Sequence, residues 1–217
     1  MTTSSYLALL QGAGVSLLLA LCAVAVGIPL GLLLALARWR RVPVLDGAIA
    51  AYVSVMRPTP VVTLCLLVFF VMPAAGLDLP PMAAAALALS LNTTAFNCEI
   101  WRAALLALPA DQLEAGAAFG FSGWQTLVRI VLPQLWRASL GPLVSEITLL
   151  LKITPAASVI GIVDITRAAG RIGADTYDPL PPFLAATVLY TLIIALGVQG
   201  QRLLERRAAQ RYGYLSS

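Results

Sequence analysis

Four long stretches of the chain contain no aspartate, glutamate, lysine, arginine or histidine: residues 1–37, 58–77, 79–98 and 179–201. A bilayer core of about 30 Å needs about 20 mostly apolar residues in a helix that rises about 1.5 Å per residue. Each stretch therefore has the length of a membrane-spanning helix. Hydrophobic residues make up 60% of the 217 residues and charged residues only 11%, against about a quarter charged in an average soluble domain. This composition excludes a soluble globular enzyme.

We therefore expect an all-α integral membrane protein that forms a single transmembrane domain over residues 1–217. The apolar runs predict five spans, at about 9–37, 50–71, 82–106, 140–163 and 183–204. The second span carries Arg57 and the Pro58-Thr59-Pro60 sequence, which interrupts the helix. The fourth crosses the membrane only if it tolerates Glu146 and Lys152.

The distribution of basic residues predicts the orientation of these spans. Basic residues concentrate in cytoplasmic segments of membrane proteins. With the N-terminus outside and the C-terminus in the cytoplasm, only two arginines lie outside, Arg167 and Arg171. Ten lie on the cytoplasmic side: Arg38, Arg40, Arg41, Arg102, Arg129, Arg137, Arg202, Arg206, Arg207 and Arg211. This orientation places the polar segment 109–137 in the cytoplasm.

The net charge of +4 does not point to nucleic acid, because the chain has a single lysine and its arginines form no dense patch. Cys22, Cys65 and Cys98 lie singly in apolar windows, and the chain has no histidine, so no metal site is expected. No catalytic residues are expected either. A phosphate-binding loop needs a Gly-Lys-Ser/Thr sequence, and Lys152 is not in one, so the chain is not expected to hydrolyse ATP.

The segment 109–137 reads as two short helices joined by a glycine turn. Asp111 and Glu114 have the spacing of a capping box, which predicts a helix start there. The helix continues to Phe119, and Gly120 is placed to end it in a left-handed conformation.

A second capping box, Ser122 with Gln125, begins the next short helix. Its apolar stripe has the spacing i, i+3, i+4, i+7, and we expect this stripe to pack against the membrane bundle. Its members are Trp124, Leu127, Val128 and Val131. The helix is expected to stop before Pro133. On these grounds alone the segment is either an ordered connection or a docking site for a soluble partner.

The residues of this segment resemble a known loop. Glu114-Ala115-Gly116, then Gly120, then Ile130-Val131-Leu132-Pro133 are similar to the EAA loop of the membrane-spanning permease subunits of bacterial ABC importers.

Three further segments resemble the polar amino acid permeases of the histidine, glutamine and arginine type, and the resemblance covers about 9–207. They are Arg57-Pro58-Thr59-Pro60, then Glu99-Ile100 with Arg102, and Leu151-Lys152 with Thr154 and Ser158-Val159-Ile160-Gly161. Pro58, Gly116, Ile153 and Pro155 depart from the family pattern, which has glycine, alanine, aspartate and serine at these places.

The resemblance implies a fold similar to the type I ABC importers, in a bacterial inner membrane. It implies that the helix 111–119 docks in a groove of a cytoplasmic ATP-binding subunit, which binds ATP and Mg²⁺; this chain would hold no cofactor. Glu114 would fix the start of that helix, Ala115 and Gly116 would permit close approach, and Gly120 would set the turn. The full set of coupling residues is Asp111, Glu114, Ala115, Gly116, Ala118, Gly120 and Pro133.

Polar side chains within the spans are the candidates for the translocation pathway, because an isolated charge in hydrocarbon costs at least about 2.5 kcal/mol. They are Arg57, Thr59, Glu99, Glu146, Lys152 and Thr154. Glu99 and Arg102 are also spaced for an i,i+3 ion pair. Glu146 and Lys152, six residues apart, are not on one helical face.

Further partners follow from the size of the chain and from the resemblance. Five helices are too few to enclose a pathway, so a second permease subunit, identical or homologous, is expected, together with surrounding membrane lipid. A periplasmic or extracellular solute-binding protein would deliver the solute. The segment 164–182 is expected to be an external loop, and its charged residues are a candidate docking surface: Asp164, Arg167, Arg171, Asp175 and Asp178.

Three alternatives remain open at this point. An ABC permease for another class of solute has the same architecture. A secondary transporter driven by an ion gradient explains intramembrane charges equally well, but it needs no EAA-like loop and usually shows an internal repeat. A membrane-embedded enzyme is the poorest alternative, because no nucleophile and base have a recognisable spacing.

Overall fold

The structure, a computed structural model, describes residues 2–40 and 43–212, and within these ranges all regular structure is helical. The sequence-based prediction of an all-α fold is therefore confirmed. The long helices are α1 (Thr3–Trp39), α4 (Pro81–Leu106), α7 (Leu132–Ile153) and α9 (Leu180–Tyr212). The shorter ones are α2 (Pro43–Met56), α3 (Val61–Ala74), α5 (Ala110–Ala118), α6 (Gly123–Thr126) and α8 (Ile165–Thr176). Arg41 and the side chains of Arg206, Arg207 and Arg211, which the charge argument uses, lie outside what is described.

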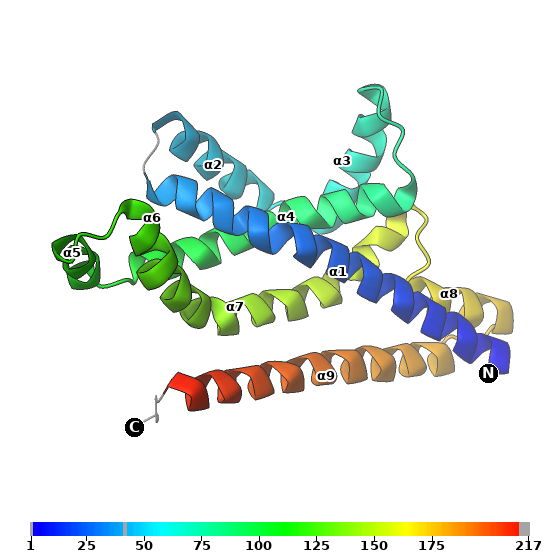
Figure 1. Cartoon of the computed structure of the whole chain (residues 1–217). Helices are drawn as coiled ribbons and strands as arrows, with labels where there is room; N and C mark the ends of the chain where they lie inside the picture. Colours follow the sequence, from blue (N-terminus) through cyan, green and yellow to red (C-terminus); the bar gives the residue numbers. More distant parts are fainter. Residues whose placement is uncertain (1, 41–42, 213–217) are drawn as a thin grey trace.

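α1 and α4 form the centre of the molecule and lie side by side along its length (Figure 1). Their close approach depends on glycines of α1. A Cβ atom added to Gly27 would lie 2.4 Å from Thr93 Cγ2, and one added to Gly31 would lie 2.7 Å from the Asn97 Cβ. Glycine is therefore the only residue that permits this helix separation at the two positions.

The predicted second span is two helices in the structure. α2 and α3 meet at 112° across the break that contains Pro58 and Pro60. Proline has no N–H and ends helical hydrogen bonding. The Thr59 hydroxyl donates to the Val55 carbonyl at 2.6 Å, which satisfies an acceptor that the break leaves free. α2 also begins earlier than the predicted start of this span at about residue 50, and it includes Asp46.

The segment after α4 differs from the prediction at two points. α5 begins at Ala110, with Pro109 at the N-cap position and no side-chain cap. Asp111 is therefore inside the first turn, where a negative charge stabilises the positive N-terminal end of the helix dipole. The predicted first capping box is absent. The second helix does not stop before Pro133. A π-helical turn, Leu127–Val131, leads directly into α7, and Pro133 lies in the first turn of α7, where proline is tolerated.

The end of the predicted fourth span is irregular. α7 ends at Ile153, and a 3₁₀ segment, Thr154–Ile160, follows it up to Gly161, which has a φ of +99°. Pro155 cannot donate a backbone hydrogen bond, and the Thr154 hydroxyl donates to the Leu151 carbonyl at 2.9 Å. The α-helical part of this span is thus shorter than predicted at its end.

The predicted external loop 164–182 contains a helix, α8. Asp164 is its N-cap and accepts hydrogen bonds from the backbone N–H groups of Thr166 and Arg167. Its side chain is fully buried and also accepts a hydrogen bond from the Tyr190 hydroxyl at 3.1 Å. Asp164 therefore stabilises the packing of α8 on α9 and does not belong to an exposed docking surface, which corrects the prediction. Asp175 and Asp178 are exposed.

Three helical stretches of the described chain are long and apolar enough to cross a membrane: Thr3–Trp39, Gly123–Ile160 and Leu180–Gly200. The bent α2–α3 pair makes a fourth. α4, on which the third span was predicted, is not among these stretches; it carries Ser90, Asn92 and Asn97, which are buried against the other helices. In Figure 1 the start of α1 lies beside α8, and α5 and the end of α9 lie at the other end.

Candidate functional site

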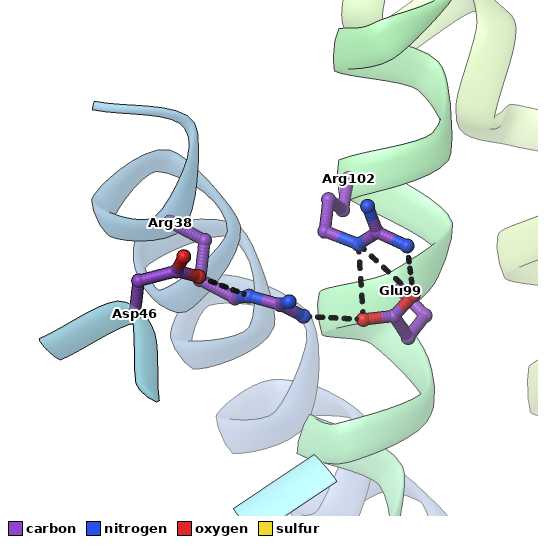
Figure 2. A network of polar contacts seen from close by, with 4 residues as sticks. All are labelled: Arg38, Asp46, Glu99 and Arg102. Carbon is purple, nitrogen blue, oxygen red and sulfur yellow. Dashed lines mark hydrogen bonds and ion pairs between the residues drawn. The ribbon is translucent and has the colours of Figure 1, made fainter. Parts of the chain in front are cut away.

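Four charged side chains meet where the ends of α1 and α4 approach the start of α2 (Figure 2). Arg38 Nη1 lies 2.7 Å from Glu99 Oε1, and Arg38 Nε lies 3.0 Å from Asp46 Oδ1. Arg102 donates to the same glutamate, with Nη2 2.8 Å from Oε2. The ion pair predicted between Glu99 and Arg102 is therefore present. The contacts of Arg38 with Glu99 and with Asp46 were not predicted, because nothing in the sequence pairs residues of different helices.

Burial decides which of these contacts matter most. The side chains of Arg38 and Glu99 are only 17% and 20% exposed, whereas that of Asp46 is 46% exposed. Charged hydrogen bonds gain strength as they leave water, and exposed ion pairs contribute little. The Arg38–Glu99 contact therefore fixes the end of α1 against α4, and Asp46 adds a weaker contact to α2.

A pocket of about 590 Å³ lies next to this cluster, between α1, α2 and α4. Its lining carries three arginines but only one carboxylate: Arg38, Ala50, Val53, Ser54, Arg57, Pro58, Phe96, Glu99 and Arg102. The guanidinium of Arg57 lies over the Phe96 ring, with Cζ 5.2 Å from the ring centroid. Of the predicted pathway residues, the structure brings Arg57 and Glu99 together here.

The other pathway candidates lie outside this pocket. Glu146 is a buried residue of α7, and Lys152, two turns later, is exposed; the two do not share a helical face, as their spacing predicts. Thr154 is fully buried in the 3₁₀ segment, and Thr59 is partly buried in the α2–α3 break. Glu146 interacts electrostatically with Arg57, so it belongs to the same electrostatic environment as the pocket.

The segment predicted to be cytoplasmic and to serve in coupling presents one face of α5 outward. Asp111, Glu114, Ala115 and Ala118 are exposed on it. Gly116 is buried instead, and a Cβ atom added to it would lie 2.9 Å from Ile130 Cδ1. Its small size therefore permits close approach of the chain's own π-helical turn, and not of a partner as predicted.

The end of α5 has the geometry predicted from Gly120. This residue has a φ of +73°, and its N–H donates to the Ala117 carbonyl while that of Phe121 donates to Gly116. This pair of hydrogen bonds is a Schellman motif, which satisfies carbonyls at a helix end. The turn fixes the direction in which the chain leaves α5.

The second half of the segment confirms the Ser122–Gln125 capping box, in which each side chain accepts a hydrogen bond from the other residue's backbone N–H. Its apolar stripe divides into two parts. Leu127 and Val131 are buried against the bundle, but Trp124 is 69% exposed and Val128 is also exposed. These two side chains therefore do not anchor the segment, which corrects the prediction. They add apolar surface near α5, where Phe119 is 82% exposed.

A side-chain contact also links α5 to a long helix. The Gln134 amide of α7 donates to the Gln112 side chain of α5. This hydrogen bond joins α5 to the start of α7. In the part of the chain that the structure describes, no cluster of histidine, cysteine, aspartate or glutamate has the arrangement of a metal site.

Comparison with known proteins gives a consistent result. A family model described as a binding-protein-dependent transport system inner membrane component matches residues 27–210. The L-cystine transport system permease protein TcyB of Bacillus subtilis is 37% identical over 182 residues, which cover 83% of this chain and 78% of that protein. The glutamine transport system permease protein GlnP of Escherichia coli is 32% identical over 201 residues, 92% of each chain.

A solved structure of an amino acid ABC transporter has the same fold. It was determined with histidines, superposes with a TM-score of 0.86 at 28% identity, and the match covers 95% of this chain and all of that one.

Proposed function

Because the chain belongs to the family of binding-protein-dependent transport system inner membrane components, we propose that it forms the membrane pathway for a polar amino acid in an ATP-driven ABC importer. Relatives named as permeases for L-cystine and for glutamine support this class of solute. One observation carries the proposal: the exposed face of α5. This helix lies in the segment 109–137, which also resembles the EAA loop of the family.

The energy for transport comes from a separate cytoplasmic subunit that binds ATP and Mg²⁺. α5 docks in a groove of that subunit through Asp111, Glu114, Ala115 and Ala118, which are exposed together. The Schellman turn at Gly120 and the Gln112–Gln134 contact hold α5 against the start of α7. Closure of two ATP-binding subunits then moves α7 and the helices packed on it.

Two permease chains enclose the pathway around a two-fold axis. A solute-binding protein delivers the amino acid at the end where α8 lies, and the exposed Asp175 and Asp178 are available for docking there. α9 is exposed along most of its described surface and faces lipid or the second permease chain.

Co-purification tests this proposal directly. A tagged chain extracted gently from bacterial membranes should retain an ATP-binding subunit that hydrolyses ATP. Glu114→Lys should leave membrane insertion intact, reduce recovery of that subunit about tenfold, and abolish uptake, because it reverses the charge on the docking face. Asp78→Lys, an exposed charge reversal between α3 and α4, is the matched control and should retain the subunit.

Two results would count against the proposal. Recovery of the chain without any nucleotide-hydrolysing partner would favour transport driven by an ion gradient. Full uptake by Glu114→Lys, with the ATP-binding subunit still bound, would remove the role assigned to Glu114.

A further inference from the structure

The pocket between α1, α2 and α4 carries more positive charge than its carboxylates neutralise. Glu99 accepts hydrogen bonds from both Arg38 and Arg102, so its two oxygens are already occupied. Asp46 contacts the far side of Arg38 and does not line the pocket. Arg57 is the arginine of the lining that remains to be explained.

Arg57 is held in place without a carboxylate. Within the described residues, no carboxylate lies within ion-pair distance of its guanidinium. Its Cζ lies over the Phe96 ring, and within the described residues its side-chain N–H donors have no hydrogen-bond acceptor. Glu146, the buried carboxylate on α7, influences Arg57 electrostatically but makes no hydrogen bond or ion pair with it in the described part of the chain.

Arg57 is exposed in the single chain, so within a membrane its charge requires a polar environment outside the chain's own core. Arg57 follows α2 and lies level with Phe96, about three helical turns before the end of α4. At such a position a charge faces water or a counter-ion, because hydrocarbon would be costly. The pocket supplies the space: 590 Å³ is within the range of about 300 to 1,000 Å³ typical of small-molecule sites.

We propose that this pocket is a carboxylate site of the translocation pathway, in which the free fork of Arg57 binds the carboxylate of the transported amino acid. A guanidinium matches a carboxylate with two parallel hydrogen bonds. The Arg38–Glu99–Arg102 cluster keeps the neighbouring arginines fixed and maintains positive charge around the site. This inference rests on the proposed importer function, and it assigns a specific chemical group of the solute to a specific residue.

Direct binding to the permease complex tests the assignment. The purified complex with its ATP-binding subunit, in phosphatidylcholine nanodiscs without the solute-binding protein, would be titrated with radiolabelled L-cystine, L-glutamine and L-arginine. Whichever binds is then competed with its decarboxylated amine: cystamine, 4-aminobutanamide or agmatine. We expect the amine to compete about 100-fold more weakly, because it lacks the group that Arg57 recognises.

Variants localise the effect to Arg57. Arg57→Gln should raise the Kd about 10- to 100-fold, and Arg57→Lys should raise it less, because lysine retains the charge but loses the planar fork. Arg202→Gln, an exposed arginine of α9, is the control and should leave the Kd unchanged. Gel filtration with the ATP-binding subunit verifies that each variant assembles, which separates this test from failure of the importer function.

Three outcomes would overturn the proposal. One is an unchanged Kd in Arg57→Gln, and a second is equal competition by the amine. The third is the absence of amino acid binding up to millimolar concentration in an assembled complex. If that complex instead retained phosphatidylglycerol, and Arg57→Gln lost it, the pocket would be assigned to lipid phosphate.

Discussion

Glu99 joins two helices because one carboxylate accepts hydrogen bonds from arginines of both. Replacing it with glutamine removes the negative charge and leaves Arg38 and Arg102 facing each other. We expect Glu99→Gln to lower the free energy of unfolding by about 1 to 3 kcal/mol, since the contact is mostly buried. Thermal unfolding in detergent, followed by fluorescence, measures the change.

Asp46→Asn provides the matched comparison. It removes a carboxylate from the same cluster at a half-exposed position, so the expected loss is below about 1 kcal/mol. Equal losses for the two variants would show that the cluster stabilises α2 as much as the α1–α4 contact, contrary to the burial argument.

Tyr190 donates to a carboxylate that is completely shielded from water. Tyr190→Phe leaves Asp164 with only its backbone donors, and a lost hydrogen bond to a buried charge costs about 1 to 3 kcal/mol. We expect a lower unfolding temperature than for Tyr6→Phe, which changes an exposed tyrosine and should be neutral within about 0.5 kcal/mol. Unfolding temperatures of the two variants that do not differ would contradict a stabilising role for this hydrogen bond.

At the residue scale, sequence reasoning found contacts that are local in the chain. The i,i+3 pair of Glu99 and Arg102 and the Ser122–Gln125 box follow from helical spacing. The contact of Arg38 with Glu99 and that of Tyr190 with Asp164 depend on how helices pack, and no periodicity encodes that. The contact of Gly116 with Ile130 also depends on packing, because Ile130 lies in the π-helical turn fourteen residues later, so spacing along the chain predicts close approach of a partner instead.

At the scale of elements, the α1–α4 packing makes a sharp prediction about glycine. Alanine at position 31 would place its Cβ within 2.7 Å of the Asn97 Cβ and 2.9 Å of the Cys98 backbone nitrogen. Backbone cannot move aside cheaply, so Gly31→Ala should cost about 1 to 3 kcal/mol by overpacking. The yield of folded chain from detergent-solubilised membranes and its unfolding temperature report the loss.

Gly14→Ala is the control in the same helix. No atom lies within 4 Å of the added Cβ, and alanine favours helix, so stability should be equal or slightly higher. If both substitutions were tolerated, α1 and α4 would be further apart than the structure places them.

The elements that sequence reasoning placed incorrectly share a physical cause. The segment 164–182 carries five charged residues and a proline-rich end, which predict a loop, yet Ile165, Ala168, Ala169 and Ile172 are buried with the spacing i, i+3, i+4, i+7. That stripe was the available signal. The predicted stop before Pro133 is wrong because a proline is compatible with the first turn of a helix, and the π-helical turn before it keeps the chain helical.

For the whole molecule, the absence of charge over membrane-length stretches was sufficient to predict an all-helical membrane protein. It could not predict that a long helix with buried Asn92 and Asn97 would be central. Asn92 of α4 donates to the Met56 carbonyl at the end of α2, and Tyr52 of α2 donates to the Leu91 carbonyl. These hydrogen bonds join α2 to α4 beside the break, and they position Arg57 over Phe96, which is the geometry on which the carboxylate site depends.

The orientation of the whole chain is a prediction that two engineered cysteines can decide. Ten of the thirteen arginines fall on one side of the predicted topology and two on the other, and translocating that many charges is unfavourable. α5 and α6 lie at the end of the molecule opposite to α8 (Figure 1), so one label at each end is sufficient. Gly123→Cys and Ala174→Cys are both at exposed positions.

The two labels would be read in a background with Cys22, Cys65 and Cys98 replaced by alanine and without the ATP-binding subunit, which would otherwise cover α6. A membrane-impermeant maleimide should modify only the cysteine at 174 in right-side-out vesicles and only that at 123 in inverted ones. The reverse pattern would place α5 outside the cell, away from any ATP. Labelling of both from one side would require an even number of crossings between α6 and α8, whereas α7 with its 3₁₀ extension makes one.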